Sequence, residues 1–392
     1  MYRSAALQAA TENVKEEVIQ WRRYLHENPE LSFEEEKTSQ FVYDTLSSFG
    51  NLEVTRPTKY SVMARLIGSQ PGKTLGIRAD MDALPIQEEN TFEFTSKIPG
   101  KMHACGHDGH TAMLLGAAKV LSAFKDQIKG EVRFFFQHAE EYFPGGAKEM
   151  VEAGVMKGVD FVIAAHLMSH VDFGKVGITY GPMMAAPDAF WITINGKGGH
   201  GGMPHQTTDS ITIGAQVVTN LQHIVSRNID PLDNLVVSIG KFVGGEAANV
   251  IANSVEINGT VRSFDEKVRA SVPVLMERIV KGITEAHGAT YEFKYLNGYM
   301  PVINHDEVTR VIEDTVREVY GEDTIEIQRP SMGAEDFSAF QKEAPSAYFL
   351  IGARNEEKGI VYPHHHPRFT VDEDAFDYGV KIFANAVFKF LG

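Results

Sequence analysis

Histidines are concentrated in a few short segments of the sequence. Eleven of the 15 histidines fall in five segments, several of them beside acidic residues or the single cysteine. Imidazole, carboxylate and thiolate together suit zinc and its neighbours in the first transition series, and not magnesium or calcium. The pattern therefore predicts a transition-metal site. The segments are MHACGHDGH (102–110), QHAEE (137–141), AHLMSH (165–170), GGHGGMPH (198–205) and PHHHP (363–367).

The first segment places Cys105 and His107 at the junction between a loop and an expected helix. Their Cys-x-His spacing is too short for a structural zinc finger, which spaces its paired cysteines and histidines more widely. Two roles remain open for Cys105: a metal ligand, or a nucleophile activated by His107 or His110. We expect His103 and His110 to support the site without binding the metal.

Acidic residues and a histidine stand at the ends of three expected strands. Because ligands of open α/β sheets bind beyond the carboxyl ends of the strands, these side chains should share one crevice. One of two adjacent glutamates can bind metal while the other moves a proton. The ligands outnumber the three that usually hold one catalytic zinc, so we expect two ions that share a bridging residue. The side chains are Glu140 and Glu141 after VRFFFQ, His166 at the end of DFVIAAH, and Asp80 and Asp82 after KTLGIR.

The order of strand-like and helix-like stretches predicts an α/β fold with a largely parallel sheet. From about residue 188 the order becomes strand, helix, strand, strand, helix, strand, which is a ferredoxin-like βαββαβ unit inserted into the first domain. We expect a catalytic domain over residues 1–183 and 298–392 and the inserted domain over 184–297, with hinges at Gly-Pro 181–182 and Asn-Gly 297–298. The main expected helices cover residues 108–124, 145–152, 209–227 and 266–287.

Composition excludes several classes of partner. The 392 residues include 37 basic and 52 acidic ones, and the net charge of -15 would repel a nucleic-acid backbone. A single cysteine cannot form an intrachain disulfide, which fits a reducing compartment. The N-terminal stretch carries charges throughout and does not resemble a signal peptide, and no apolar run approaches the roughly 20 residues that span a bilayer. We therefore expect a cytoplasmic protein without nucleic-acid or membrane partners.

Taken together, these segments resemble the metal-dependent amidohydrolase family that includes hippurate hydrolase, N-acyl-amino-acid amidohydrolase, N-acetyldiaminopimelate deacetylase and the auxin-conjugate hydrolases. Nine motifs match in order along almost the whole chain, so the resemblance is specific. It implies a dinuclear-metal, exopeptidase-like catalytic domain with an inserted lid through which two subunits form a homodimer. The motifs are HENPELSFEE, RADMDALP, MHACGHDGHTAML, FQHAEE, AAHL, GKGGHGGMPH, GTVRSF, GAEDF and HHHPRFTVDEDA.

The resemblance also implies a role for individual residues. Glu140 is the general base, Asp82 orients the site and Cys105 bridges the two ions. Three histidines precede Pro367 where relatives often have one or two; alignment favours His365 as the ligand, with His364 as the alternative. The implied metal ligands are Cys105, His107, Glu141, His166 and His365. The lid histidine His200 is implied to help hold the substrate and to take part in catalysis from the partner subunit, and the implied substrate-binding residues are Asn249 and Arg262. His205 is an alternative to His200, and Arg262 could instead pair with an acid.

The implied reaction is hydrolysis of the amide bond of an N-acetyl, N-benzoyl or similar amino acid. The expected cofactors are two divalent transition-metal ions per chain, zinc or manganese first, with cobalt or nickel as alternatives. Glu140 would accept the proton of the attacking water, and Arg262 would bind the substrate carboxylate with its forked donors. The alternatives are a dipeptidase or carboxypeptidase, a thiol amidohydrolase that uses Cys105, and a binding protein without catalysis.

Overall fold

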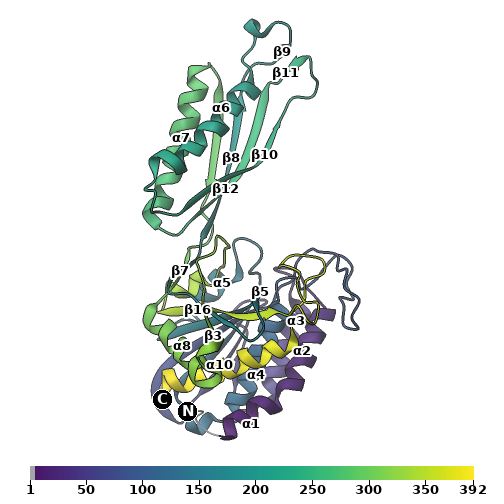
Figure 1. Ribbon diagram of the computed structural model, residues 1–392, viewed down its shortest axis with the longest axis vertical. Helices are drawn as coiled ribbons and strands as arrows, with labels where there is room; N and C mark the ends of the chain where they lie inside the picture. The colour runs from purple at the N-terminus through teal and green to yellow at the C-terminus, as the bar shows by residue number, and fades with distance from the viewer. Residues whose placement is uncertain (1–4) are drawn as a thin grey trace. The chain divides into compact units, whose positions relative to one another are not determined.

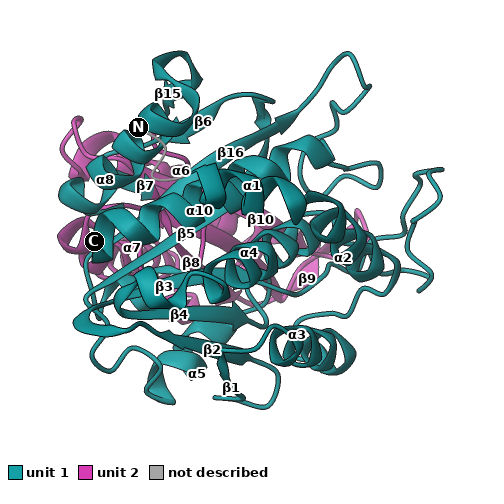
Figure 2. Ribbon diagram, turned by 90° about the horizontal axis from the view of Figure 1, so that it is seen from below, with its two compact units in different colours: residues 1–183, 303–329, 336–392 teal, residues 184–302, 330–335 magenta. Residues whose placement is uncertain are grey.

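Two compact units make up the protein (Figure 2). This computed structural model describes residues 5–392. The larger unit holds the residues up to 183 together with 303–329 and 336–392, and the smaller unit holds 184–302 and 330–335. The return to the larger unit comes later than residue 298 because Gly298 is tied to the smaller unit. Its N–H donates to Asp188 (2.9 Å), and its carbonyl accepts from Arg269 (3.0 Å).

The larger unit is built on an eight-stranded sheet in the order β1-β2-β4-β3-β5-β16-β6-β15. Its four central strands, β4, β3, β5 and β16, are parallel to one another, as the sequence predicts. The strands are β1 (Glu53–Thr55), β2 (Val62–Ile67), β3 (Gln70–Asp80), β4 (Lys129–Gln137), β5 (Phe161–Asp172), β6 (Val176–Ile178), β15 (Ile325–Ile327) and β16 (Ser346–Arg354).

Helices cover this sheet, which explains why its central strands are apolar on both faces. Helix α4 packs beside α10 and α2, and both α4 and α10 contact β3 (Figure 1). None of the described helices is long and apolar enough to cross a membrane. The helices are α1 (Ala5–Asn13), α2 (Lys15–Glu27), α3 (Glu36–Ser48), α4 (His107–Ser122), α5 (Gly146–Glu152), α8 (Asp306–Tyr320), α9 (Ser338–Gln341) and α10 (Phe376–Leu391).

One expectation about the strands is wrong, because β5 does not end at His166. It continues to Asp172, since β16 goes on pairing with it and sets Met168 opposite Gly352. The neighbours β3 and β4 do end here, with Asp80 opposite Gln137. The register of β3 on β5 sets Arg78 opposite Ala164, so His166 lies level with the end of β3. His166 therefore reaches the same edge of the sheet from within a strand.

The smaller unit has the predicted ferredoxin-like order. Its antiparallel sheet runs β10-β12-β8-β13, and helices α6 and α7 pack on one another over it. Asp209 and Asp265 begin the two helices, each accepting hydrogen bonds from two backbone N–H groups of the first turn. The elements are β8 (Ala186–Asn195), α6 (Ser210–His223), β10 (Leu235–Gly244), β12 (Ser254–Ser263), α7 (Glu266–Ala286) and β13 (Thr290–Leu296).

Two small ladders complete the fold. Strands β9 (Gly199–His200) and β11 (Val250–Ile251) pair at one end of the smaller unit. Strands β7 (Gly181–Met184) and β14 (Val302–Asn304) pair where the chain passes from one unit to the other.

Candidate metal centre

The residues expected to bind metal meet in the larger unit. Gly106, in a left-handed conformation (φ 95°), forms the N-cap of α4 and brings Cys105 and His107 to the helix start. Glu141 comes from the turn after β4, and His166 comes from β5. These four side chains come from three separate segments of the chain, which only folding brings together.

Four groups of candidate ligand atoms, each lying within 4.8 Å of one another, occur among the described residues, and Cys105 belongs to two of them. Those two are Cys105, His107 and Glu141, and Cys105, His166 and His364; the others are His107, His110 and His166, and Glu140, Glu335 and Asp336. The Cys105 Sγ atom lies 3.5 Å from Nε2 of His166. A sulfur shared by two groups is the arrangement expected of a bridging ligand between two ions.

The hydrogen bonds fit metal binding, because they leave the inward-facing nitrogens free. Nδ1 of His166 donates to the carbonyl of Leu167 (2.7 Å), so Nε2, which faces Cys105, keeps its lone pair. Nδ1 of His107 contacts Asp82 (3.2 Å), whereas its buried Nε2 has no hydrogen-bond partner among the described residues. A carboxylate or carbonyl behind an imidazole is the usual outer contact of a metal-binding histidine.

The structure distinguishes His364 from His365, two of the three histidines that precede Pro367. Nε2 of His364 donates to the Leu167 carbonyl (3.0 Å) and its Nδ1 accepts from Ser169 (2.7 Å), so both nitrogens are engaged although the ring lies close to Cys105. Nε2 of His365 lies 3.2 Å from Oε1 of Glu141, and its backbone has a left-handed φ of 64°. The hydrogen bonds therefore favour His365 over His364 as a ligand.

The centre has an excess of negative charge that a cation would balance. Burial lowers the pKa of His107, but Asp80, Asp82 and Glu141 outweigh burial and raise the pKa to about 10. Burial and the carboxylates of Glu141, Glu140 and Asp80 raise the pKa of Cys105 well above its ordinary value. Nucleophilic cysteines have a lowered pKa, so these surroundings disfavour Cys105 as a nucleophile.

Asp82 touches three parts of the site. It contacts His107, accepts from the hydroxyl of Ser32 (2.6 Å) and accepts from the backbone N–H of Glu141 (3.0 Å). This agrees with an orienting role. Glu140, the expected base, is buried beside Glu141 and only 8% exposed.

The two histidines expected to support the site differ. Nδ1 of His110 donates to Asp80 (2.6 Å) and Nε2 accepts from the backbone N–H of Leu167 (2.9 Å), which links the end of β3 to the residue after His166. His103 is buried, and neither ring nitrogen has a hydrogen-bond partner within residues 5–392. His110 therefore supports the centre through hydrogen bonds, whereas His103 contributes to it through packing alone.

Sequence reasoning missed several polar residues around the centre. Arg78 lies buried in β3 and donates to Asp80 (2.6 Å) and Asp336 (2.9 Å). Glu35 accepts from the backbone N–H of Ala139 (2.7 Å), beside Glu140. An arginine within an apolar strand was the one available signal for Arg78, whereas nothing local distinguishes Glu35 from its neighbours Glu34 and Glu36.

The three expected substrate-binding residues lie in the smaller unit, at two separate places. His200 and Asn249 lie together, since His200 pairs with Val250 and the Asn249 carbonyl accepts from Gly201 N–H (2.8 Å). Arg262 lies near the other end of β12, roughly 25–30 Å along the strand from Asn253.

The local contacts of His200 and Arg262 leave donors available. Nδ1 of the exposed His200 accepts from Gly202 N–H (3.0 Å), so a neutral ring carries its proton on Nε2. The half-buried Arg262 donates to Thr260 and to the Val261 carbonyl, and no ion pair joins it to an acid in the described part of the chain.

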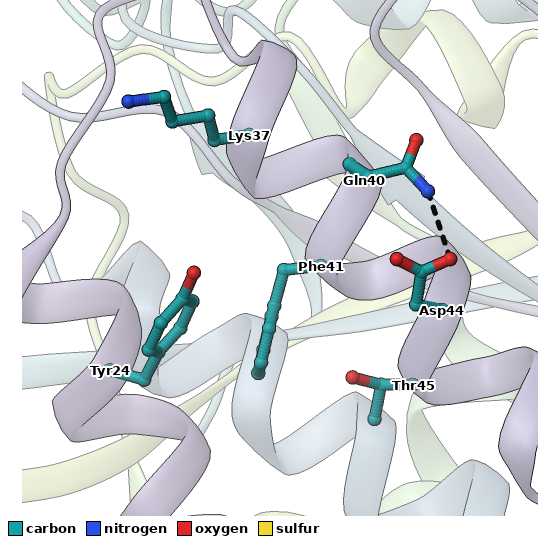
Figure 3. A pocket seen from close by; sticks show the side chains of 6 residues that line it. All are labelled: Tyr24, Lys37, Gln40, Phe41, Asp44 and Thr45. Atoms are coloured by element: carbon teal, nitrogen blue, oxygen red, sulfur yellow. Dashed lines mark hydrogen bonds between the residues drawn. The ribbon is translucent and has the colours of Figure 1, made fainter.

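A surface hollow of about 540 Å³ lies elsewhere, between α2 and α3. Tyr24 and Phe41 stack there at 4.4 Å between ring centroids, beside Lys37 and Asp44 (Figure 3). The residues that line the hollow include no histidine or cysteine, so it lacks the metal-binding groups that gather around Cys105.

Comparisons with known proteins point the same way. A profile described as peptidase family M20/M25/M40 matches residues 76–389. An N-acyl-L-amino acid amidohydrolase of Geobacillus stearothermophilus is 71% identical over 296 residues, 76% of this chain and 80% of the relative. Thermostable carboxypeptidase 2 of Saccharolobus solfataricus is 45% identical over 383 residues, 96% of each chain. The crystal structure of the YXEP protein of Bacillus subtilis, described as a dinuclear metal binding peptidase from family M20, matches with a TM-score of 0.84 and 35% identity, covering 97% of this chain and 99% of that chain.

Proposed function

The chain belongs to peptidase family M20/M25/M40, and from this premise we propose that it hydrolyses N-acyl amino acids to a free amino acid and a carboxylic acid. It is an amide-bond hydrolase of the kind that its 71% identical relative is named for. The observation that carries the proposal is the membership of Cys105 in two adjacent groups of metal-binding atoms.

Two divalent transition-metal ions per chain complete the proposed site, with zinc or manganese first and cobalt or nickel as alternatives. Bound ions of this kind acidify a water molecule and polarise a carbonyl group. The proposed ligands are Cys105, His107, Glu141, His166 and His365. Three observations support this set. Nε2 of His107 is buried without a hydrogen-bond partner among the described residues, Nε2 of His166 faces Cys105, and Nε2 of His365 lies 3.2 Å from Glu141.

Glu140 acts as the proton carrier in this proposal. It takes a proton from the attacking water and returns it to the nitrogen of the leaving amino acid. Its neighbour Glu141 lies against His107 and His365, so the two adjacent carboxylates have different surroundings. This difference supports one glutamate for chemistry and the other for metal.

Substrate recognition is assigned to the smaller unit. Arg262 is half-buried and forms no ion pair within the described chain, although the Asp188 carboxylate favours its charged form, and its guanidinium suits a substrate carboxylate. The Nε2–H of His200 suits the carbonyl oxygen that becomes negative during attack. Because Arg262 would bind a free carboxylate, the enzyme would cleave the amide bond at the carboxyl-terminal end of its substrate and not bonds within a longer chain.

We infer that the working enzyme is a homodimer. Arg262 lies roughly 25–30 Å along β12 from Asn253, which follows the β9–β11 ladder that carries His200 and Asn249, and this is too far for all three to contact one small substrate. If all three bind substrate, they must come from two chains. The lid histidine of one chain would then serve the metal centre of the other.

A cytoplasmic location completes the proposal. A metal-binding thiolate is lost when it is oxidised, so the lone Cys105 needs a reducing compartment.

A carboxypeptidase or dipeptidase is the second candidate. It is favoured by the 45% identical relative named as a carboxypeptidase, and it would use the same carboxylate-binding arginine.

A substrate panel tests the proposal. Purified protein is stripped with a chelator, reloaded with zinc or manganese, and assayed for release of free amino acid from N-acetyl and N-benzoyl amino acids and from dipeptides. We expect activity on the acyl amino acids that disappears on chelation.

Glu140→Gln should lower turnover by roughly 10²–10⁴ and keep its metal, whereas Glu141→Gln should lose metal. Full activity of metal-free protein would refute the proposal, and activity on peptides alone would select the second candidate.

A further inference from the structure

The turn that carries Glu140 has a strained backbone, and this inference rests on the proposed role of that residue as base. Ala139 is fully buried and left-handed, with φ at 50°. For a residue with a Cβ atom this conformation is strained and persists only when neighbouring groups hold it. Something other than Ala139 itself must therefore fix the turn.

Two carboxyl groups hold the backbone on either side of Glu140. Oδ2 of Asp82 accepts from the N–H of Glu141 (3.0 Å), and Oε1 of Glu35 accepts from the N–H of Ala139 (2.7 Å). The Ala139 carbonyl accepts from Gly146 (2.9 Å). The strained residue is thus held at both its N–H and its C=O.

Glu35 serves the turn and not its own helix. Its backbone forms the N-cap of α3, but its side chain makes no capping hydrogen bond and reaches across to Ala139. The side chain is fully buried, and Oε2 has no hydrogen-bond partner within the described chain. Burying a half-satisfied carboxyl group costs free energy, so stability of α3 does not account for this residue.

We propose that Glu35 is a positioning residue for catalysis: its hydrogen bond to Ala139 sets the direction in which Glu140 faces the attacking water. A displacement of about 1 Å in a catalytic group can cost on the order of 10² in rate. The metal-binding neighbour Glu141 is held separately by Asp82. Loss of the Glu35 contact should therefore affect turnover and leave metal binding intact.

Two substitutions separate the hydrogen bond from the rest of the side chain. Glu35→Gln keeps a carbonyl oxygen for the Ala139 N–H, so its kcat should stay within about threefold of wild type. Glu35→Leu has a similar size without an acceptor, so its kcat should fall by about 10²-fold. Its KM should stay within about threefold, and its metal content should be unchanged. Glu35→Asp, whose shorter side chain no longer reaches Ala139, should repeat the loss of kcat and serves if the leucine variant does not fold.

Glu30 provides a matched control. It caps the same helix through the backbone N–H of Thr38 (2.8 Å) and does not bond the Glu140 turn. Glu30→Leu, which removes the acceptor as Glu35→Leu does, should lower the unfolding temperature and leave kcat unchanged.

The experiment measures kcat and KM of the metal-loaded enzymes on one N-acyl amino acid, metal content by mass spectrometry, and unfolding temperature. Unchanged kcat in folded Glu35→Leu, loss of metal in step with activity, or an equal loss of kcat in Glu35→Gln would each overturn the role of Glu35. An inactive wild type would instead refute the proposed function.

Discussion

Two of the three histidines proposed as ligands are held by a contact on the nitrogen that faces away from the centre. His166 is held by the Leu167 carbonyl, and His107 by Asp82. His364, which is not proposed as a ligand, differs from them because both of its nitrogens are already bonded. At the scale of single residues, the hydrogen-bond partners therefore separate ligands from neighbours better than proximity does.

This contrast predicts different outcomes for two adjacent substitutions. His365→Ala should lower the metal content of the purified protein, since it removes the imidazole that lies 3.2 Å from Glu141. His364→Ala should keep both ions and mainly lower stability, because it removes hydrogen bonds to Leu167 and Ser169. Elemental analysis and thermal unfolding of the two variants check this. Metal loss in His364→Ala with full metal in His365→Ala would reverse the assignment.

Glu35 predicts a dependence of stability on pH. Burial, and next the Asp82 carboxylate, raise its pKa to about 8 from an ordinary 4.5. Between these values the folded protein keeps a proton that the unfolded chain has lost. The free energy of unfolding therefore falls as pH rises, by roughly 1.4 kcal/mol per pH unit for this group.

The Glu35→Gln variant has no carboxyl group at this position, so its free energy of unfolding lacks this decrease with rising pH. The unfolding temperature of the variant, relative to wild type, should therefore rise between pH 5 and pH 8. A difference that stays constant with pH would mean that Glu35 is already ionised in the folded protein.

At the scale of elements, α4 connects the metal centre to the core. Nearly every residue of the helix is buried, in agreement with its small and apolar sequence after His110. A Cβ atom on Gly116 would lie 2.6 Å from Val18 and 2.9 Å from Val380, both β-branched residues of the flanking helices α2 and α10. The helices can approach α4 this closely only because glycine has no side chain.

We therefore expect Gly116→Ala to destabilise the larger unit by about 1–3 kcal/mol through overpacking. Gly282 in α7 is the control, because a Cβ there would meet no atom within 4 Å. Gly282→Ala should stabilise the smaller unit by about 0.4–1 kcal/mol, since alanine favours a helix more than glycine does. Thermal unfolding monitored by calorimetry measures both, and a gain in stability for Gly116→Ala would contradict the close packing.

At the scale of the whole molecule, the proposed dimer leads to a specific prediction. If the β9–β11 end of one chain serves the metal centre of the other, a mixed dimer of His200→Ala and Glu140→Gln chains holds one complete site. Co-expression of these two inactive variants should restore up to about half of the wild-type activity per mixed dimer, because each site needs one intact copy of each group.

Co-expression of His200→Ala with Asn249→Ala is the matched control. His200 lies on β9 and Asn249 directly precedes β11, its partner strand, so each site of the mixed dimer receives one damaged copy and activity should stay low. Mixed dimers of the first pair that form and remain inactive would place His200 in its own chain's site.

The sequence by itself determined the fold class, the inserted βαββαβ unit and the kinds of side chain at the centre. Apolar runs, their order, and polar residues at strand ends are properties of local sequence, and hydrophobic burial acts on them directly. The comparisons confirm the family and the hydrolase activity that the motifs predicted. The ligand set and the roles of His200, Asn249 and Arg262 stay predictions.

Only the tertiary structure decided how those side chains are held. The continuation of β5 past His166 depends on pairing with β16, and the difference between His364 and His365 depends on Leu167, Ser169 and Glu141. The contact of Glu35 with Ala139 joins residues 104 positions apart. Such contacts form between segments that meet only on folding, so no local pattern in the sequence encodes them.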